Sequence, residues 1–333
     1  MRSLTTVWPD PTPQQLLAGF TPPPHFANAR FENFVPQDDS QRSAVADLQA
    51  FVALLNRPDR RRWFSRGTES MVGRYLDGGF GVGKTHLLAA IWHASAVPAA
   101  FGTFVGYTNL VGALGFQQVV EALARFRLVC IDEFELDDPG DTVLMSSLCR
   151  RLVERGVTLA ATSNTLPDRL GEERFAAEDF LREIQGLASH FRVLRIEGED
   201  FRLRDRLPQV GARSETEVRT FVESVPGATL DDFDALLAHL AKVHPSRYRL
   251  LLTDVPAVGI LNAHPLHDQA AALRMVVLVD RMYDLEIPVA LHGVDIADLF
   301  AAELLSGGYR KKYFRALSRL ESLQVSPFQA PER

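Results

Sequence analysis

Apolar residues in this chain gather in short runs that alternate with stretches of helical pattern, an arrangement typical of an α/β fold. The runs at 127–134 and 157–164 are almost continuously apolar until they end in polar residues, as expected of strands buried on both faces of a sheet. A shorter run at 73–77 precedes a glycine-rich stretch, and residues 86–93 carry apolar side chains at helical spacing. The pattern therefore predicts a strand, a glycine loop and a helix in that order.

The same patterns predict the remaining elements. Strands are expected at 103–107, 191–196, 248–253 and 287–291. Helices are expected at 40–55, 141–155, 178–187, 230–243, 268–283, about 295–305 and 312–324. The pattern leaves open whether 287–291 extends the main sheet or belongs to a separate subdomain.

The glycine-rich stretch from Gly78 to Thr85 matches the P-loop pattern G-x-x-x-x-G-K-[ST]. Glycines let backbone N–H groups converge on phosphate oxygens, and the helix that follows directs the positive end of its dipole there. The Lys84 ammonium supplies a charge for the β- and γ-phosphates, and the Thr85 hydroxyl completes a Mg²⁺ shell. The pattern predicts an ATP site made of Gly78, Gly79, Phe80, Gly81, Val82, Gly83, Lys84, Thr85 and His86.

Two carboxylates, Asp132 and Glu133, end the buried run that begins at Arg127. In sheets of this kind ligands bind at the carboxyl ends of the strands, where the phosphate loop also opens. We expect Asp132, together with Thr85, to hold Mg²⁺, and Glu133 to act as the general base that polarises the attacking water. The pair is therefore interpreted as a Walker B motif.

Other residues are candidates for contact with the nucleotide. Asn164 lies at the polar tip of the next buried run, where we expect it to position the attacking water or contact the γ-phosphate, the role called sensor 1. Upstream of the P-loop, Phe34 and Pro36 are candidate contacts for the base. A hydrophobic packing role explains these two equally well.

The fold class predicted from these motifs is a P-loop ATPase of AAA+ type, with a central parallel sheet flanked by helices and further C-terminal α/β and helical elements. Residues 1–24 are rich in proline, which favours an extended arm over a packed element. The stretch 197–228 is charged and irregular. The expected domains are an arm at 1–24, the ATPase core at 25–200, a connector or inserted hairpin at 201–228, a C-terminal α/β and lid region at 229–325 and a tail at 326–333.

Composition narrows the class of protein. The chain has 333 residues, 46% of them hydrophobic, which is enough for one large core and a further subdomain. Its net charge is −6, so nucleic acid is not expected, although a local basic groove is not excluded. Two cysteines, Cys130 and Cys149, lie in apolar segments without metal-ligand spacing. Because no apolar run reaches the length of a membrane span and prolines interrupt the N-terminal residues, we expect a cytoplasmic protein.

Several segments resemble the ZapE family of AAA+ ATPases, which includes the mitochondrial Afg-like ATPases, and the resemblance runs from about residue 22 to residue 323. The segments that carry it are 75–85, 131–138, 161–167, 254–256, 278–284 and 314–320. The chain departs from the family pattern at Phe201, where members often carry a tyrosine, and at Leu273 and Ala177, where they often carry an arginine. The last departure bears on an arginine finger and leaves the ATPase motifs intact.

The resemblance implies a cytoplasmic, Mg²⁺-dependent ATPase linked to cell division. Bacterial members act on the tubulin-like division protein FtsZ and mitochondrial members assist protein turnover; a chain without a targeting presequence favours the bacterial role. Ring-forming ATPases present an arginine finger to the γ-phosphate of a neighbour. Arg174 and Arg182 are the candidates, and we take Arg182. Such a finger would require a homo-oligomer. For sensor 2 the candidates are Arg274, Arg315 and Arg319, and we take Arg319.

Two other interpretations stay open. The run 83–87 also resembles replication initiators and helicase loaders of the same superfamily, whose affinity for DNA would fall steeply with salt. An ATP-gated scaffold would bind nucleotide without releasing phosphate. The preferred prediction is an ATPase that couples hydrolysis to the remodelling of a protein partner, with FtsZ as the candidate.

Overall fold

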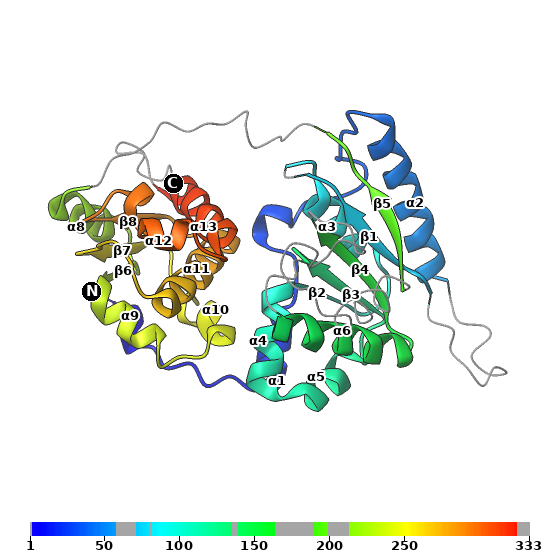
Figure 1. Cartoon of the computed structure of the whole chain (residues 1–333), viewed down its shortest axis with the longest axis horizontal. Coiled ribbons are helices and arrows are strands. Elements are labelled where there is room, and N and C mark those ends of the chain that lie inside the picture. Colours follow the sequence, from blue (N-terminus) through cyan, green and yellow to red (C-terminus); the bar gives the residue numbers. More distant parts are fainter. Residues whose placement is uncertain are drawn as a thin grey trace. The chain divides into compact units, whose positions relative to one another are not determined.

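The structure is a computed structural model and describes residues 2–57, 71–79, 81–134, 139–163, 190–198 and 213–324 (Figure 1). The chain divides into two compact units. The P-loop unit is Leu17–Arg206, and the C-terminal unit combines Leu207–Arg333 with Met1–Leu16. Each unit has a parallel sheet of its own, so the two are described separately.

The P-loop unit is built on a five-stranded parallel sheet in the order β2-β3-β4-β1-β5 (Figure 1). Its strands are β1 Gly73–Asp77, β2 Ala99–Thr103, β3 Leu128–Asp132, β4 Thr158–Ser163 and β5 Phe191–Arg195. The strands β1, β3 and β4 are buried along their whole length, which explains their apolar runs. Because β4 lies between β1 and β3 in a parallel sheet, the carboxyl ends of these three strands lie side by side at one edge of the sheet.

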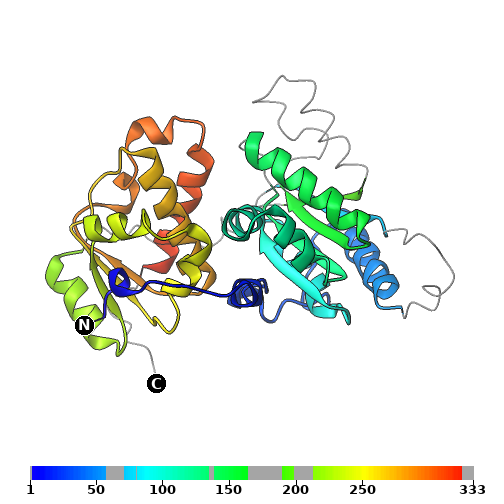
Figure 2. The same ribbon diagram turned by 90° about the horizontal axis from the view of Figure 1, so that it is seen from below.

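Helices cover both faces of this sheet (Figures 1 and 2). One face carries α2 Asp39–Leu55 and α3 Lys84–Ala94, and the other carries α4 Phe104–Leu114, α5 Phe116–Leu123 and α6 Pro139–Glu154. A short 3-10 helix, Pro24–Phe26, precedes α2. The core beneath α2 and α3 contains Leu48, Phe51, Leu88 and Ile91, which lie at helical spacing on their helices.

The structure confirms most of the strands and helices predicted for this unit, but the strand expected at 103–107 is wrong. The strand β2 ends at Thr103, whose side chain accepts a hydrogen bond from the Gly106 N–H at 3.0 Å and caps α4. The apolar run continues from β2 into the helix without a break, so the pattern placed the strand too far along the chain. The helix expected at 178–187 lies outside the described residues.

The C-terminal unit has a three-stranded parallel sheet in the order β6-β7-β8, with strands β6 Thr229–Asp232, β7 Val258–Leu261 and β8 Val289–Leu291. Thus β8 belongs to this separate sheet. Its helices are α8 Glu215–Ser224, α9 Phe233–Leu240, α10 Tyr248–Leu251, α11 Gln269–Asp284, α12 Ala302–Leu305 and α13 Arg310–Leu323, with 3-10 helices at Leu4–Thr6, Pro245–Arg247 and Ile296–Asp298. After Leu4–Thr6 the chain forms α1 Pro13–Ala18, within which the division between the two units falls. Within the described residues, no helix is long and apolar enough to cross a membrane.

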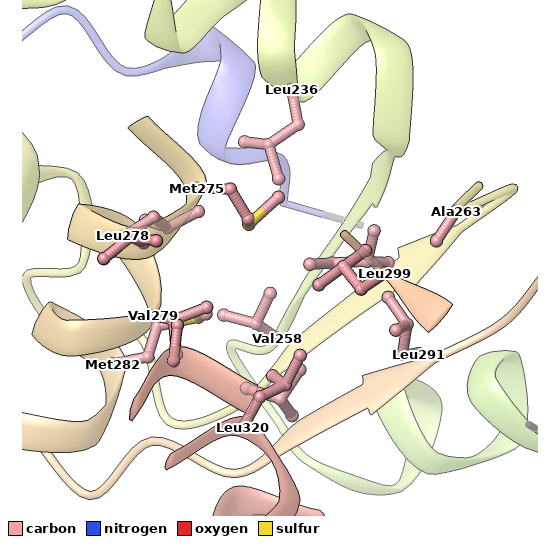
Figure 3. Packing of buried hydrophobic residues seen from close by; sticks show 14 of the residues in the cluster. Leu236, Val258, Ala263, Met275, Leu278, Val279, Met282, Leu291, Leu299 and Leu320 are labelled. Atoms are coloured by element: carbon pink, nitrogen blue, oxygen red, sulfur yellow. The ribbon is translucent and has the colours of Figure 1, made fainter. Parts of the chain in front are cut away.

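The main core of this unit lies between its sheet and the helices α9, α11 and α13. Figure 3 shows Leu236 of α9, Met275 and Val279 of α11 and Leu320 of α13 gathered around Val258 of β7. All five side chains are buried. The hydrophobic effect therefore holds these three helices on one face of the small sheet.

Two expectations for this unit are corrected: the helix expected at 230–243 is present but starts later, and the strand expected at 248–253 is wrong. The segment 230–243 begins as β6, and α9 starts only after Asp232, whose carboxylate accepts from the Ala235 N–H at 3.2 Å. The segment 248–253 is not a strand. Pro245 starts a helical turn there, and α10 follows with Tyr248 and Leu251 on its buried side.

The segment 197–228, expected to be irregular, contains the regular helix α8. Ser214 and Glu217 form a reciprocal capping box at its start. Its apolar residues Val218 and Val222 lie over Gly259 of β7, where an added Cβ would come within 2.5 Å of Val222. The absence of a side chain at Gly259 therefore allows α8 to cover the second face of the sheet.

The N-terminal residues pack on the C-terminal unit, whereas an extended arm was expected. Arg2 bridges to Thr229 at the edge of β6, and Leu4 is fully buried in the core. The Asp231 carboxylate accepts from the Ser3 hydroxyl at 2.5 Å and from the Leu4 N–H at 3.2 Å. The prolines that suggested an arm come after these first packed residues. Because the composition was averaged over residues 1–24, it did not reveal that the first residues pack on the core.

Two ion pairs join α11 to α13. The Asp280 side chain is 17% exposed and accepts from Arg315 at 2.9 Å and from Arg319 at 2.6 Å. Burial by itself raises the pKa of this carboxyl, but the two guanidinium groups outweigh that effect and hold the pKa below its ordinary value. The Arg319 guanidinium also lies 5.1 Å from the ring centroid of Tyr283.

Leu4→Ala is expected to destabilise the C-terminal unit by about 2–5 kcal/mol, because it removes a fully buried side chain and leaves a cavity. Urea denaturation of the full chain measures the loss. The control is Leu54→Ala in α2, where the leucine is 45% exposed and the loss should be much smaller. Equal losses in the two variants would show that the N-terminal residues do not contribute to the core.

Asp280→Asn is expected to cost about 3–5 kcal/mol at neutral pH, because two guanidinium groups lose their buried counter-charge. The pKa of Asp280 in the folded state lies below its ordinary value of 3.8, so its contribution to stability is present above that pH and is lost as the pH falls through the folded pKa. The variant and the wild type should therefore converge in acid. Urea denaturation across the acid range tests this, with exposed Asp298→Asn as the control; a difference independent of pH contradicts the assignment.

Candidate functional site

The loop between β1 and α3 has the backbone geometry of a phosphate cradle. Gly83 has φ 90° and stands at the N-cap of α3, where an added Cβ would lie 2.5 Å from the Phe34 ring. A Cβ at Gly78 would come within 2.1 Å of the Ile196 carbonyl oxygen. Since Gly83 brings no capping side chain to the helix, the first N–H groups of α3 are suited to an anion.

Lys84 lies inside this loop. Its side chain is largely buried, with 9% of the residue exposed, and its ammonium donates to the carbonyl of Gly78 at 2.8 Å and to that of Gly79. The loop carbonyls therefore hold the charge beside the amide cradle. This is where the sequence analysis placed the charge for the β- and γ-phosphates.

Thr85 and Asp132 meet across the edge of the sheet. The Thr85 hydroxyl donates to Asp132 Oδ1 at 3.1 Å, and Asp132 is buried at the carboxyl end of β3. A hydroxyl that donates its proton to a carboxylate keeps its oxygen lone pairs for another partner. Hydroxyl and carboxylate oxygens are the ligands that Mg²⁺ prefers, so this pair fits a magnesium ion beside the phosphate cradle.

Glu133 turns the chain away from β3 in an unusual backbone conformation. Its φ is 52°, a region that costs a residue with a side chain about 1–2 kcal/mol. The next residue, Phe134, is fully buried and packs edge-on against the rings of Tyr75 and Phe104. Strain of this kind persists only where surrounding contacts hold it, and it is concentrated at functional sites.

Thr162 is a site residue that the sequence analysis did not single out. It lies on β4, between the strands that carry the P-loop and Asp132, and is 2% exposed. Its hydroxyl contacts the Asp132 carboxylate at 2.5 Å and the Glu133 N–H at 3.0 Å, and its carbonyl accepts from the Phe134 N–H at 2.7 Å. The segment 161–167 was noted only for its resemblance to a family motif, and its chemistry was assigned to Asn164.

A cavity of about 270 Å³ opens beside the P-loop. It is lined by Asn33, Phe34, Val35, Gln37, Gln41, Gly81, Val82, Gly83 and His86. The His86 ring contacts the Arg30 carbonyl at 3.0 Å and lies 5.6 Å from the Phe34 ring, so it helps to hold the cavity wall against α3. Pro36, the other candidate for base contact, is not among the lining residues.

Gln41 is a second residue that the sequence analysis missed. It is 3% exposed, and its side-chain amide accepts from the Gln37 N–H at 2.7 Å and donates to the Glu197 carbonyl at 2.8 Å. These bonds fix the segment that carries Phe34 to the segment that follows β5. No local motif marks a buried glutamine at the start of an amphipathic helix, so only the structure identifies it.

The described residues thus place Lys84, Thr85, His86, Asp132 and Glu133 within one site. Phe80, Asn164 and Arg182 lie outside the described residues, as does Arg174. Arg319 lies in the C-terminal unit, on α13, where it is bound to Asp280. Its expected role as sensor 2 stays a prediction.

Comparison with known proteins identifies the family. The model of a family described as AFG1-like ATPase matches residues 12–213 and 207–332, which together make up nearly the whole chain. The chain belongs to the AFG1-like ATPase family. This confirms both the resemblance inferred from the sequence and the predicted fold class, a parallel sheet flanked by helices.

Two curated relatives of this AFG1-like ATPase are cell division protein ZapE of Escherichia coli strain K12 and lactation elevated protein 1 homolog B of Danio rerio. ZapE is 26% identical over 377 aligned positions, covering 92% of this chain and 97% of ZapE. The zebrafish protein is 31% identical over 94 positions, covering 28% of this chain and 19% of that protein. The similarity to ZapE therefore extends over both units.

Solved structures similar to this AFG1-like ATPase include DnaI and the replication initiator DnaA bound to AMPPCP and single-stranded DNA. DnaI gives a TM-score of 0.43 at 19% identity and covers 54% of this chain and 94% of its own. DnaA gives 0.40 at 12% identity and covers 89% of this chain and 91% of its own. At such TM-scores these similarities say nothing about function.

Proposed function

We propose that this AFG1-like ATPase binds Mg-ATP and hydrolyses it at the site formed by the P-loop, Thr85, Asp132 and Glu133. The observation that carries the proposal is the 3.1 Å hydrogen bond from Thr85 to Asp132, because it joins the start of α3 to the end of β3 next to the amide cradle. Bound Mg²⁺ would neutralise charge that develops on the transferred phosphoryl group. Thr85 and Asp132 are the residues that would hold it.

Each protein group then has a defined task. The amides of the loop and the Lys84 ammonium bind the phosphate oxygens and stabilise their negative charge. Glu133 takes a proton from the attacking water. We further propose Asn164 as the residue that orients this water, Arg182 as the finger supplied by a neighbouring copy and Arg319 as sensor 2.

The cavity beside the P-loop is proposed to hold the nucleotide base. Phe34 lines it and offers an aromatic face for stacking, and His86 adds a second ring next to it. Gln41 already uses its amide on protein partners, so it shapes the cavity. The predicted contact of Phe34 with the base is part of this proposal, and Pro36 is not.

We propose a cytoplasmic role in cell division, with FtsZ filaments as the protein partner that the ATPase cycle remodels. The support is the similarity over almost the full length to a protein named for cell division. The buried free thiols of Cys130 and Cys149 fit a reducing compartment. An arginine finger would make hydrolysis depend on assembly into a homo-oligomer.

Lys84→Ala is expected to abolish ATP binding, because the phosphates lose their fixed cation. Glu133→Gln is expected to bind ATP but to hydrolyse it about 10²–10⁴-fold more slowly, because the amide takes no proton from water. Phosphate release and the binding of a fluorescent ATP analogue measure the two effects. The control for the second variant is Glu121→Gln on the exposed face of α5. Wild-type rates in both site variants would refute the assignment.

Sedimentation of purified FtsZ filaments tests the proposed partner. With ATP, the wild-type protein should change the amount of FtsZ that pellets, and Glu133→Gln should pellet with the filaments because its cycle stalls with nucleotide bound. The change in the amount of pelleted FtsZ should persist when the salt concentration is raised. If neither protein affects the filaments, FtsZ is not the partner. DNA affinity that falls steeply with salt would instead support the helicase-loading interpretation.

A further inference from the structure

Thr162 holds three consecutive residues at the end of the neighbouring strand. Its hydroxyl contacts the side chain of Asp132 and the backbone of Glu133, and its carbonyl binds the backbone of Phe134. It lies on the central strand β4, paired with Leu76 of β1. Thus one buried residue of β4 fixes the segment that leaves β3.

The chemistry of these contacts defines the direction of each hydrogen bond. A carboxylate only accepts, so the single hydroxyl proton of Thr162 goes to Asp132 Oδ1 at 2.5 Å, a short charge-assisted bond. The Glu133 N–H, 3.0 Å away, then donates to the hydroxyl oxygen. Asp132 Oδ1 therefore receives two hydroxyl protons, one from Thr162 and one from Thr85.

The two bonds of the hydroxyl connect the metal-binding carboxylate with the backbone of the general base. The bond to Asp132 sets the orientation of that carboxylate toward Thr85. The bond to the Glu133 N–H supports the residue with φ 52°. Threonine suits this task because its β-branched side chain has few rotamers.

We propose that Thr162 is a positioning residue for the proposed ATPase reaction, and that its hydroxyl aligns Asp132 for the metal and Glu133 for the water at the same time. The inference rests on the proposed function. It predicts that losing the hydroxyl harms the Mg²⁺-dependent steps and spares the binding of phosphates to the loop, because among the described residues the Thr162 hydroxyl bonds to Asp132 and Glu133.

The variants are Thr162→Val, which removes the hydroxyl at nearly constant volume, and Thr162→Ser, which keeps it. The control is Thr158→Val, on the same strand and also buried, but at its other end. Thr162→Val should lower kcat for ATP about 10- to 100-fold, as expected for a residue that orients metal ligands. Thr162→Ser should restore most of the activity, and Thr158→Val should behave as the wild type.

A second readout does not require turnover. ADP affinity is measured by calorimetry with EDTA and again with Mg²⁺ in excess. Thr162→Val should match the wild type in EDTA and should lose most of the affinity gained from Mg²⁺, which Thr162→Ser should retain. Urea denaturation of each variant checks that the fold is intact.

The outcomes separate the two proposals. If the wild type hydrolyses ATP but Thr162→Val equals Thr158→Val in kcat and in the Mg²⁺ effect, the role of Thr162 is wrong and the proposed ATPase stands. If Thr162→Val loses as much ADP affinity in EDTA as in Mg²⁺, the role of Thr162 is also wrong, because such a loss reports general damage to the site. A wild type that gains ADP affinity from Mg²⁺ without hydrolysing ATP contradicts the proposed function, and the loss of that gain in Thr162→Val would still support the positioning role.

Discussion

The carboxylate of Asp132 is held by hydroxyls from two different elements, Thr85 at the start of α3 and Thr162 on β4. Because Asp132 itself ends β3, this one group ties the start of α3 to the carboxyl ends of β3 and β4. A parallel sheet brings the carboxyl ends of its strands to one edge, and here that edge carries the phosphate cradle and the acidic pair. Packing contacts around these strands keep this edge of the sheet in place.

The surrounding packing explains how the site is kept rigid. Phe134 inserts between aromatic rings and anchors the strained turn at Glu133. On the opposite side of the loop, Phe34 approaches Gly83 so closely that a side chain at Gly83 would not fit. The cavity proposed for the base and the loop proposed to cradle the phosphates therefore share one wall.

The sequence predicted the parts of the fold where chemistry and periodicity agree. The runs that became β1, β3 and β4 are buried on both faces, so their apolar patterns were unambiguous. Motif and position singled out Lys84, Thr85, Asp132 and Glu133; the structure places them near one another, and their roles stay predictions. Prediction failed where a capping residue determines the point at which a strand ends and a helix begins, as at Thr103 and Asp232. The roles of Thr162 and Leu4 depend on contacts between residues far apart in the chain, which no local pattern contains.

The proposed metal ion would be held by Thr85 and Asp132 at the end of the P-loop. A crystal structure of the protein with Mn²⁺ and AMPPCP, recorded with anomalous scattering from manganese, tests this proposal most directly. The account predicts one anomalous peak in contact with the Thr85 hydroxyl oxygen, on the side of Asp132, with the phosphates of the nucleotide along residues 78–85. A peak elsewhere, or nucleotide bound away from this loop, would contradict it.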